Sequence, residues 1–420
     1  ASTISQAKPY AGQDSPASWH FYQQGFVDLT TENAAVQCWD PDSATGSFDG
    51  TLPHPCEPGW WPDPLLDVPM DTTTGRPSVP VVHPNTTQPL LLELCVARNA
   101  RPGNYTGTVA VKANAPTPST KTWRWTVPVE LEVWPILLPL TNESDSFGTA
   151  FGFDYLDLNR LYYPSLSTDQ LLDQWLPFLA KRRIPGDDLY MKLPRPVEVY
   201  EKLRRIGGAR QVNLMSTWHC AHLSPPNCGI TQGDIDYVLG VIGGFLNGSA
   251  YAKQTYEAQG FYAYGWDQSP WQAEPAVKAL YQAIKARYPL LTTAAVLDWD
   301  NHCRAKASNC YDNTSLDWFT ESHGFPMDRW VTHYDQLTLV LPTADSANKS
   351  YIKLVSDWKA QGKSYWWYMM VGPYDVHAMN PIFIERPTIE GRMLFWLAAL
   401  HGIDGMLYWA DDYWDNQCHG

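Results

Sequence analysis

The residues best suited to chemistry in this chain are Asp267 and Gln268, near the end of the stretch FYAYGWDQSP at residues 261–270. The apolar residues before them predict a buried strand, which Pro270 ends. A carboxylate at a strand end can orient and polarise a bound group, whereas an amide neither gives nor takes a proton at ordinary pH. The stretch therefore predicts a functional site at the end of a strand, with an acid and a neutral amide side by side.

Carboxylates and aromatic rings also follow most of the other predicted strands. Indole and phenol rings offer flat faces for sugar rings, and carboxylates accept hydrogen bonds from hydroxyls or transfer protons, as glycosidic bond cleavage requires. For each residue alone, a place on a solvated rim or in the core is an equally good interpretation, but the repetition favours a shared site. The candidate substrate-binding residues are Asp154, Tyr155, Trp218, His219, Trp266, Asp298, Trp299, His333, Tyr334, Asp335, Trp366, Trp367, Tyr368, Asn380, Trp409 and Asp411.

The elements that position these residues alternate between strands and amphipathic helices. Predicted strands lie at 147–154, 187–191, 212–219, 261–267, 292–300, 329–336, 364–371 and 405–414. Predicted helices lie at 168–183, 197–207, 234–247, 274–289, 351–362 and 389–402. This alternation predicts a (β/α)8 TIM-type barrel over residues 144–420, whose active site lies at the carboxyl ends of the strands. An open doubly wound sheet is the alternative, but no glycine-rich nucleotide fingerprint follows any predicted strand.

Residues 1–143 are predicted to form a separate β-sandwich domain, because proline and glycine punctuate apolar segments of strand length at 90–97, 105–113 and 125–134. At the other end, the sequence stops soon after the eighth predicted barrel strand. We therefore expect the barrel's last helix to be missing, cleaved or supplied elsewhere.

The composition limits the kinds of partner. The net charge is −14 and the longest basic run is KRR at 181–183, which argues against nucleic acid and anionic membranes. No apolar run is long enough to insert into a membrane. The 20 Trp and 23 Tyr fit either a large aromatic core or sugar stacking. A glycan is the expected partner, and nothing in the sequence indicates an oligomeric state.

The cysteines predict a secreted protein without a metal or other cofactor. No CxxC pair and no His/His/acid spacing is present, so neither redox chemistry nor a metal site is expected. The close spacings instead favour local disulfides in an oxidising compartment. The expected disulfide cysteines are Cys38 and Cys56, Cys220 and Cys228, and Cys303 and Cys310, which leaves Cys95 and Cys418 over.

Six glycosylation sequons, each Asn-x-Ser/Thr without an intervening proline, point to the same compartment. They lie at Asn85, Asn104, Asn142, Asn247, Asn313 and Asn348. We expect a mature secreted glycoprotein that starts at Ala1.

Three segments resemble glycoside hydrolase family 123. They are QPLLLELCVARNARPGNYTGTVAVKA, YAYGWDQSP and the C-terminal run from YWWYMMVGP to NPIFIERPTIEGRMLFWLAALHGIDGMLYWADDYW, of which the last is the most specific. The resemblance spans nearly the whole chain. It implies an N-terminal β-sandwich, a catalytic barrel and a retaining β-N-acetylgalactosaminidase activity that uses substrate assistance.

The resemblance also implies roles for the adjacent pair. Asp267 holds the position that orients the substrate's 2-acetamido group, whose carbonyl oxygen attacks the anomeric carbon in place of an enzyme nucleophile. Gln268 stands where the family has the glutamate that protonates the leaving oxygen. This departure leaves two interpretations: a Glu→Gln substitution that inactivates or weakens an enzyme, or a natural glutamine in a glycan-binding or extracellular structural glycoprotein. A third hypothesis, another glycosidase with a carboxylate nucleophile, would use Asp298 or Asp335.

Overall fold

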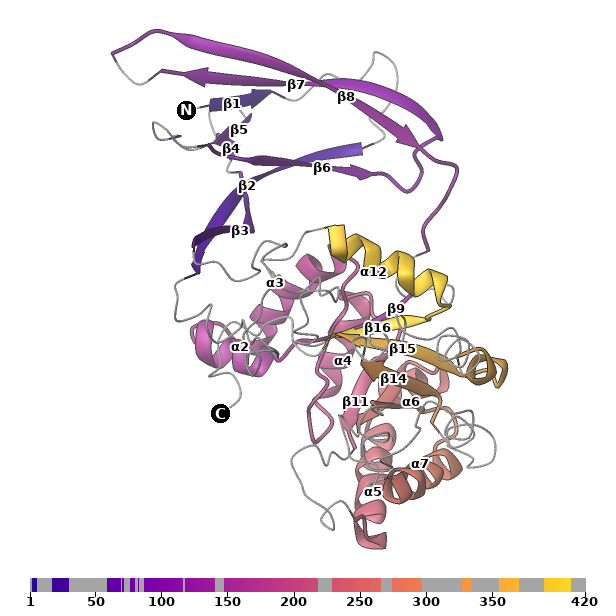
Figure 1. The fold of residues 1–420 in the computed structure, drawn as a ribbon. Coiled ribbons are helices and arrows are strands. Elements are labelled where there is room, and N and C mark those ends of the chain that lie inside the picture. Colours follow the sequence, from indigo (N-terminus) through magenta and orange to yellow (C-terminus); the bar gives the residue numbers. More distant parts are fainter. Residues whose placement is uncertain are drawn as a thin grey trace, which may run out of the picture. The chain divides into compact units, whose positions relative to one another are not determined.

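The chain divides into two compact units, Ala1–Leu138 and Pro139–Gly420. The computed structural model describes residues 2–5, 17–29, 59–68, 70–71, 76–79, 82, 87–115, 118–139, 147–217, 229–265, 274–296, 327–333, 355–369 and 389–408 (Figure 1). The predicted boundary between residues 143 and 144 lies outside these ranges. No helix among them is long and apolar enough to cross a membrane.

The first unit contains two antiparallel sheets. The strands are β1 (Ser2–Ser5), β2 (Ala17–Leu29), β3 (Gly59–Asp67), β4 (Met70–Asp71), β5 (Arg76–Val79), β6 (Leu90–Val96), β7 (Gly103–Asn114) and β8 (Thr122–Val133). One sheet has the order β4-β5-β1-β7-β8 and the other the order β3-β2-β6. The largest pairing is the hairpin of β7 and β8, which stay in register from Gly103↔Val133 to Asn114↔Thr122.

A small core joins residues of both sheets. Phe21, Val68 and Val109 are buried together, and the Trp19 indole of β2 lies over Gly107 of β7, where an added Cβ would meet it at 3.4 Å. Other apolar residues of the unit remain exposed, including Trp125 and Val127 of β8 at 52% and 50%. The predicted β-sandwich therefore stays a prediction, because the described core is small for two stacked sheets.

The second unit is built on eight parallel strands that curve into a nearly closed, TIM-like barrel. They are β9 (Gly148–Gly152), β10 (Gly186–Asp187), β11 (Val212–Ser216), β12 (Phe261–Gly265), β13 (Thr292–Val296), β14 (Arg329–His333), β15 (Ser364–Met369) and β16 (Gly405–Tyr408). Their order is β10-β9-β16-β15-β14-β13-β12-β11. Seven of the strands lie within the predicted segments, β10 overlaps its segment at Asp187 alone, and each strand is shorter than predicted. The predicted barrel is confirmed in its eight-stranded parallel sheet.

The seam between β10 and β11 is closed by side chains. No ladder joins these two strands in the described part of the chain. Instead, the Asn213 backbone N–H donates to both carboxylate oxygens of Asp187, at 2.9 and 3.1 Å, and the Asn213 amide donates to the carbonyls of Asp188 and Leu189. One backbone bond, from the Ser216 N–H to the Met191 carbonyl at 2.7 Å, completes the closure. Asp187 and Asn213 thus replace a strand ladder.

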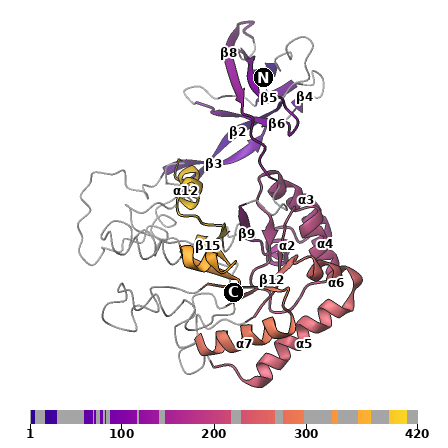
Figure 2. The same cartoon turned by 90° about the vertical axis from the view of Figure 1, so that its right-hand side faces the viewer.

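Five predicted helices are present as α3 (Thr168–Lys181), α4 (Val197–Arg205), α5 (Gln232–Gly248), α7 (Glu274–Arg287) and α12 (Ile389–Leu400), and residues 355–360 are helical in a sixth. Capping boxes at Ser167 and Thr231 begin α3 and α5, as expected for Ser/Thr before such runs. Two short helices were not predicted, α2 (Tyr155–Tyr162) and α6 (Ala250–Glu257). In Figure 2, α5 and α7 run side by side along the barrel's lower edge.

Strand alternation divides the aromatic residues between two cores. Tyr262, Tyr264, Trp366 and Tyr368 belong to the cluster inside the barrel. Their strand neighbours, such as Phe261, Tyr365 and Trp367, belong to the larger cluster between the sheet and the helices. A parallel barrel buries both faces of each strand, so both sets are apolar or aromatic.

Candidate active site at the carboxyl end of the barrel

Strand β12 leads directly to the pair that the sequence singled out. All five of its residues, Phe261–Gly265, are buried, and it pairs with β11 on one side and β13 on the other. Asp267 and Gln268 follow Gly265 by two and three residues and lie outside the described residues. Their position in the chain is nevertheless the carboxyl end of an interior strand of the barrel, which is where active sites of this fold are found.

A cluster of tyrosines occupies the described part of this end. The hydroxyls of Tyr190 and Tyr368 lie 3.3 Å apart, and either can donate. The Tyr190 ring also meets the Tyr264 ring edge-on, with centroids 6.0 Å apart. Tyr264 and Tyr368 are buried, while Tyr190 is 41% exposed. The cluster thus brings an apolar ring and a hydroxyl to the surface, both of which suit a sugar.

An acid-rich group lies beside the tyrosines, after β9 and β10. Arg195 donates from Nε and Nη2 to one oxygen of Asp188, at 3.0 and 2.7 Å. Burial raises the pKa of Asp188, Arg195 opposes this, and the charge of Asp154 raises the pKa further. Asp154 is exposed and comes two residues after the end of β9. Two carboxylates therefore share one cation at this end, which leaves acceptors for sugar hydroxyls.

Asp187 is the most deeply buried acid of the described barrel. The Tyr262 hydroxyl donates to its carboxylate at 2.7 Å, in addition to the Asn213 backbone N–H. Burial raises the pKa of Asp187 to about 7, although both hydrogen bonds oppose the shift. Its position in the seam between β10 and β11 gives it a structural role rather than contact with a substrate.

Two predicted site residues are placed where they cannot line a pocket at this end. Tyr155, the first residue of α2, is 1% exposed and belongs to the larger cluster between the sheet and the helices, where burial raises its pKa. Trp367 is 2% exposed and points away from the barrel axis into the same outer cluster, 6.1 Å from the His401 ring. The prediction failed because both residues lie on the outward side of the backbone.

Trp366 and Tyr368, both predicted to line the site, lie toward opposite ends of the barrel interior. The Trp366 indole is inside the barrel but lies over Gly148 and Gly405, the first residues of β9 and β16. It therefore occupies the amino end, opposite the predicted site. Tyr368, two residues further along β15, contacts Tyr190 at the carboxyl end.

The remaining predicted residues are outside the described part of the chain, apart from His333, of which only the backbone is described at the end of β14. Those outside are Trp218, His219, Trp266, Asp267, Gln268, Asp298, Trp299, Tyr334, Asp335, Asn380, Trp409 and Asp411. The same holds for the predicted disulfide cysteines, Cys38, Cys56, Cys220, Cys228, Cys303 and Cys310. Among the sequons, Asn104 and Asn247 are described, and both are exposed.

Sequence reasoning missed Asp188, Tyr190 and Arg195. The stretch DDLYM at residues 187–191 was assigned to a strand, but no residue of it was considered for the site. A signal was available, because two adjacent acids in an apolar strand need partners, and the basic residue of PRP at 194–196 follows closely. In the described residues, no group of three or more His, Cys, Asp or Glu could hold a metal ion.

Part of the chain matches a known protein family. Residues 316–419 match the model of the glycoside hydrolase 123 catalytic domain. This segment includes β14, β15, α12 and β16, together with the whole of the C-terminal run on which the resemblance rested. The stretch YAYGWDQSP lies outside it. No curated protein sequence matches the chain.

Solved glycosidase structures share only a distant likeness. An intracellular xylanase of Thermoanaerobacterium saccharolyticum matches with a TM-score of 0.40 at 10% identity, over 67% of this chain and 92% of that one. The β-D-glucuronidase of Dictyoglomus thermophilum gives 0.33 at 10% identity, over 73% and 51%. The β-glucuronidase of Bacteroides uniformis gives 0.34 at 10% identity, over 97% and 45%. This chain thus spans about half the length of the two glucuronidases. The resemblance seen in the sequence is confirmed at residues 316–419, which match the glycoside hydrolase 123 catalytic domain.

Proposed function

We propose that this protein is a glycoside hydrolase that acts on β-linked N-acetylhexosamines, with a preference for N-acetylgalactosamine, by a retaining, substrate-assisted mechanism. The observation that carries the proposal is the position of Asp267 and Gln268 directly after β12, an interior strand of the barrel. Acids at this end of a TIM-type barrel converge on one site. The preference for N-acetylgalactosamine rests on the family resemblance.

The proposed mechanism assigns one task to each member of the pair. Asp267 holds and polarises the acetamido group, whose carbonyl oxygen attacks the anomeric carbon and forms a cyclic intermediate with loss of the leaving group. A glutamate at position 268 would protonate the leaving oxygen and then deprotonate the attacking water. Gln268 has no carboxyl group for either transfer, so this chain is expected to bind substrate and turn it over slowly.

The described residues support the sugar-binding part of this proposal. Tyr190 offers a partly exposed ring and hydroxyl at the carboxyl end, beside the buried Tyr368. Asp154 is an exposed carboxylate beside Asp188, and the two share Arg195 as a nearby cation. Hydroxyls and carboxylates arranged around aromatic rings are suited to a pyranose, which carries hydroxyls on its rim and an apolar face.

Gln268 itself favours a second candidate function. If glutamine is the natural residue, the chain is a glycan-binding glycoprotein that keeps the barrel and has lost the proton donor. This candidate predicts saturable binding of N-acetylgalactosamine, and it predicts no turnover after a glutamate is introduced.

The test is hydrolysis of aryl β-N-acetylgalactosaminide and aryl β-N-acetylglucosaminide by the Gln268→Glu variant from acidic to neutral pH. We expect the rate to rise roughly 10²–10⁴-fold over the unchanged chain, since that is the usual contribution of a general acid. Adding Asp267→Asn should abolish the gain. Gln174→Glu, the same substitution at an exposed position of α3, is the matched control and should leave the rate unchanged.

Each result separates the two candidates. A gain specific to Gln268→Glu supports the hydrolase. Absence of hydrolysis by that variant at every pH, with both sugars, rejects it, and sugar binding measured by calorimetry on the same preparation would then support the binding protein.

We also propose that the protein is secreted and glycosylated. The exposure of Asn104 and Asn247 supports this, because a sequon must be accessible to be modified. Enzymatic removal of N-glycans from the protein secreted by a eukaryotic host should increase its electrophoretic mobility.

A further inference from the structure

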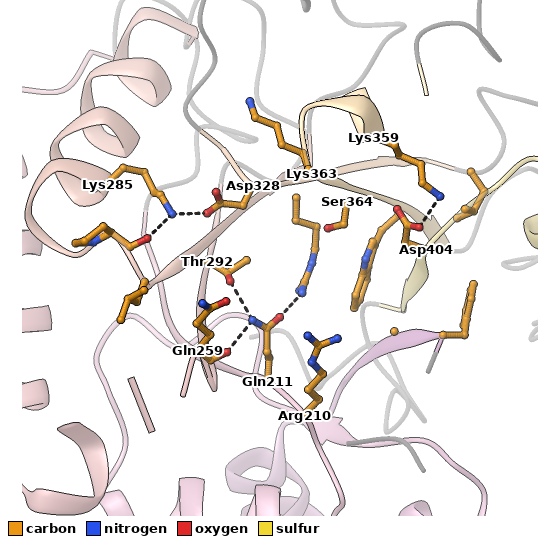
Figure 3. Close-up of a pocket in the computed structure, with 18 of the residues that line it drawn as sticks. Arg210, Gln211, Gln259, Lys285, Thr292, Asp328, Lys359, Lys363, Ser364 and Asp404 are labelled. Atoms are coloured by element: carbon orange, nitrogen blue, oxygen red, sulfur yellow. Dashed lines mark hydrogen bonds and ion pairs between the residues drawn. The ribbon is translucent and has the colours of Figure 1, made fainter. Parts of the chain in front are cut away.

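The second unit contains a cavity at the amino end of the barrel, the end opposite the carboxyl ends of the strands. Its volume is about 1090 Å³ among the described residues. Its lining includes the first residues of three strands, Thr292, Arg329 and Ser364, and residues just before two others, Gln211 and Asp404. Figure 3 shows polar and charged side chains directed into this space from several segments. The cavity is large enough for a small organic ligand.

Positive charge outweighs negative charge on the cavity wall. Five cations line it, against two carboxylates, so the difference is three positive charges. The carboxylates are each bonded to a lysine: Lys285 to Asp328 at 2.8 Å, and Lys359 to Asp404 at 2.6 Å. The cations are Arg210, Lys285, Arg329, Lys359 and Lys363. The whole chain carries a charge of −14, so this surplus runs against the overall balance.

Arg329 is the centre of this arrangement. It is only 6% exposed, and its guanidinium stacks between the rings of Trp366 at 3.8 Å and Tyr262 at 4.9 Å. Its Nη2 donates to the neutral amide oxygen of Gln211. Its buried Nε has no hydrogen-bond partner among the described residues. A buried guanidinium that donates to an amide and stacks on rings remains open to an anionic partner.

The cations of the cavity also repel one another. Burial is the main reason that the pKa of Arg329 falls to about 10. The charges of the nearby Asp187 and Asp328 oppose this fall, and the charge of Arg210 adds to it. Burial likewise lowers the pKa of Lys363; the charge of Asp328 opposes this shift, and that of Lys285 adds to it. Gathering cations in a half-buried space costs free energy, which a bound anion would offset.

We propose that this cavity binds an oxyanion, that is, a carboxylate, sulfate or phosphate group, at a site separate from the sugar-cleaving end. Guanidinium groups present planar N–H donors that match the geometry of such groups, and lysines add charge around them. The apolar rings of Phe147, Phe395 and Trp366 also line the cavity and suit the organic body of a larger ligand. The oxyanion is either a free inorganic ion or a group carried by a small molecule.

The test is isothermal titration calorimetry of the full chain with inorganic phosphate, inorganic sulfate and galactose 6-sulfate, at an ionic strength held constant with sodium chloride. We expect saturable binding of at least one probe. Tighter binding of galactose 6-sulfate than of inorganic sulfate would show that the cavity takes an oxyanion carried by a small molecule. Tighter binding of inorganic sulfate would show that it takes a free ion. The Arg210→Gln/Lys363→Gln variant should bind at least roughly tenfold more weakly, since the loss of even one charge-assisted contact of about 1.5 kcal/mol lowers the affinity by about that factor.

The matched control removes the same charge elsewhere. Arg205→Gln/Lys253→Gln changes two exposed cations on α4 and α6, away from the cavity, and should bind like the unchanged chain. Arg210 is exposed, so the Arg210→Gln single variant provides a second readout in a protein that keeps its fold. The proposal is overturned if no probe binds saturably, or if the cavity and control variants bind equally. Neither outcome bears on Gln268, so failure here is distinguishable from failure of the proposed hydrolase.

Discussion

The two ends of the barrel have the same strands but opposite chemistry. At the carboxyl end, tyrosine hydroxyls lie beside Asp154 and Asp188, which share one cation, Arg195. At the amino end, five cations face two carboxylates around the indole of Trp366. Trp366 and Tyr368 are only two residues apart on β15 and both face the barrel interior. Trp366 nevertheless belongs to the cationic amino end and Tyr368 to the acidic carboxyl end.

This difference indicates how one barrel can separate two kinds of ligand. Cleavage of a glycosidic bond requires groups that accept and transfer protons, and acids and tyrosines offer these at the carboxyl end. The amino end offers fixed positive charge, which suits binding and electrostatic attraction but supplies no base. Asp187 and Tyr262 lie between the ends, with Tyr262 hydrogen-bonded to Asp187 and its ring against Arg329.

The largest effect is expected at this junction, from Asp187. Its pKa is raised from 3.8 to about 7 by burial, so its ionisation disfavours the folded state. The protonated Asp187 side chain therefore contributes to the unfolding free energy in full at low pH. This contribution, on the order of 4 kcal/mol, is lost as the pH rises to about 7. Asp187→Asn mimics the protonated acid and should remove this part of the pH dependence. Urea unfolding of both proteins from about pH 4 to pH 8 measures this dependence. If the unfolding free energy of Asp187→Asn varies with pH as steeply as that of the unchanged chain, the role given to Asp187 is contradicted.

The acidic end is tested by Arg195→Met. This change leaves the buried carboxylate of Asp188 without its cation, at 6% side-chain exposure. Removing one partner of a buried pair is expected to cost roughly 3 kcal/mol. The control, Lys202→Met, breaks contacts with the exposed Asp169 and Asp173 and should cost about 1 kcal/mol or less. Equal losses in chemical denaturation would show that the Asp188–Arg195 pair is not special.

The amino end is tested by Gly405→Ala. A Cβ at Gly405 would collide with the Trp366 indole and with the Gly148 carbonyl oxygen at 2.7 Å, so Trp366 and the Arg329 guanidinium stacked on it must shift. We expect a loss of roughly 1–3 kcal/mol in unfolding free energy. Gly244→Ala in α5, where no atom lies within 4 Å of an added Cβ, should instead stabilise by up to about 1 kcal/mol. Opposite signs are the expected outcome, and the same sign for both would refute the close packing.

The smallest effect is expected from Tyr190→Phe, which removes the hydroxyl 3.3 Å from Tyr368. The loss of one hydrogen bond should lower the unfolding free energy by about 1 kcal/mol. Tyr237→Phe, at a 61% exposed position of α5, should have no measurable effect. If Tyr190→Phe behaves like Tyr237→Phe, the tyrosine cluster does not stabilise the carboxyl end.

The barrel could be predicted from sequence because its strands and helices have distinct apolar patterns. The second strand shows the limit: DDLYM looks like a full strand, but β10 is only Gly186–Asp187, since the Asp187 carboxylate and Asn213 replace the ladder. The helices α2 and α6 were missed because each has only eight residues. In α6 the start is set by Ser249, whose extended backbone ends α5 and whose hydroxyl caps the next helix.

The direction of aromatic side chains was harder to predict. The run SYWWYM is aromatic at four successive positions, so no polar residue indicates which side faces the helices. Trp366 and Trp367 were both assigned to the sugar pocket, and the structure places one at the amino end and the other in the outer core. The acids Asp187 and Asp188 were not assigned, because their partners Tyr262, Asn213 and Arg195 are identified only by the fold.

The most direct test of the sugar-cleaving site is a crystal structure of this chain with the thiazoline analogue of N-acetylgalactosamine, which imitates the cyclic intermediate. We predict that its ring nitrogen lies within hydrogen-bonding distance of the Asp267 carboxylate, at the carboxyl end of β12. An analogue seated at the amino end beside Arg329, or an Asp267 side chain directed away from the bound analogue, would contradict the account.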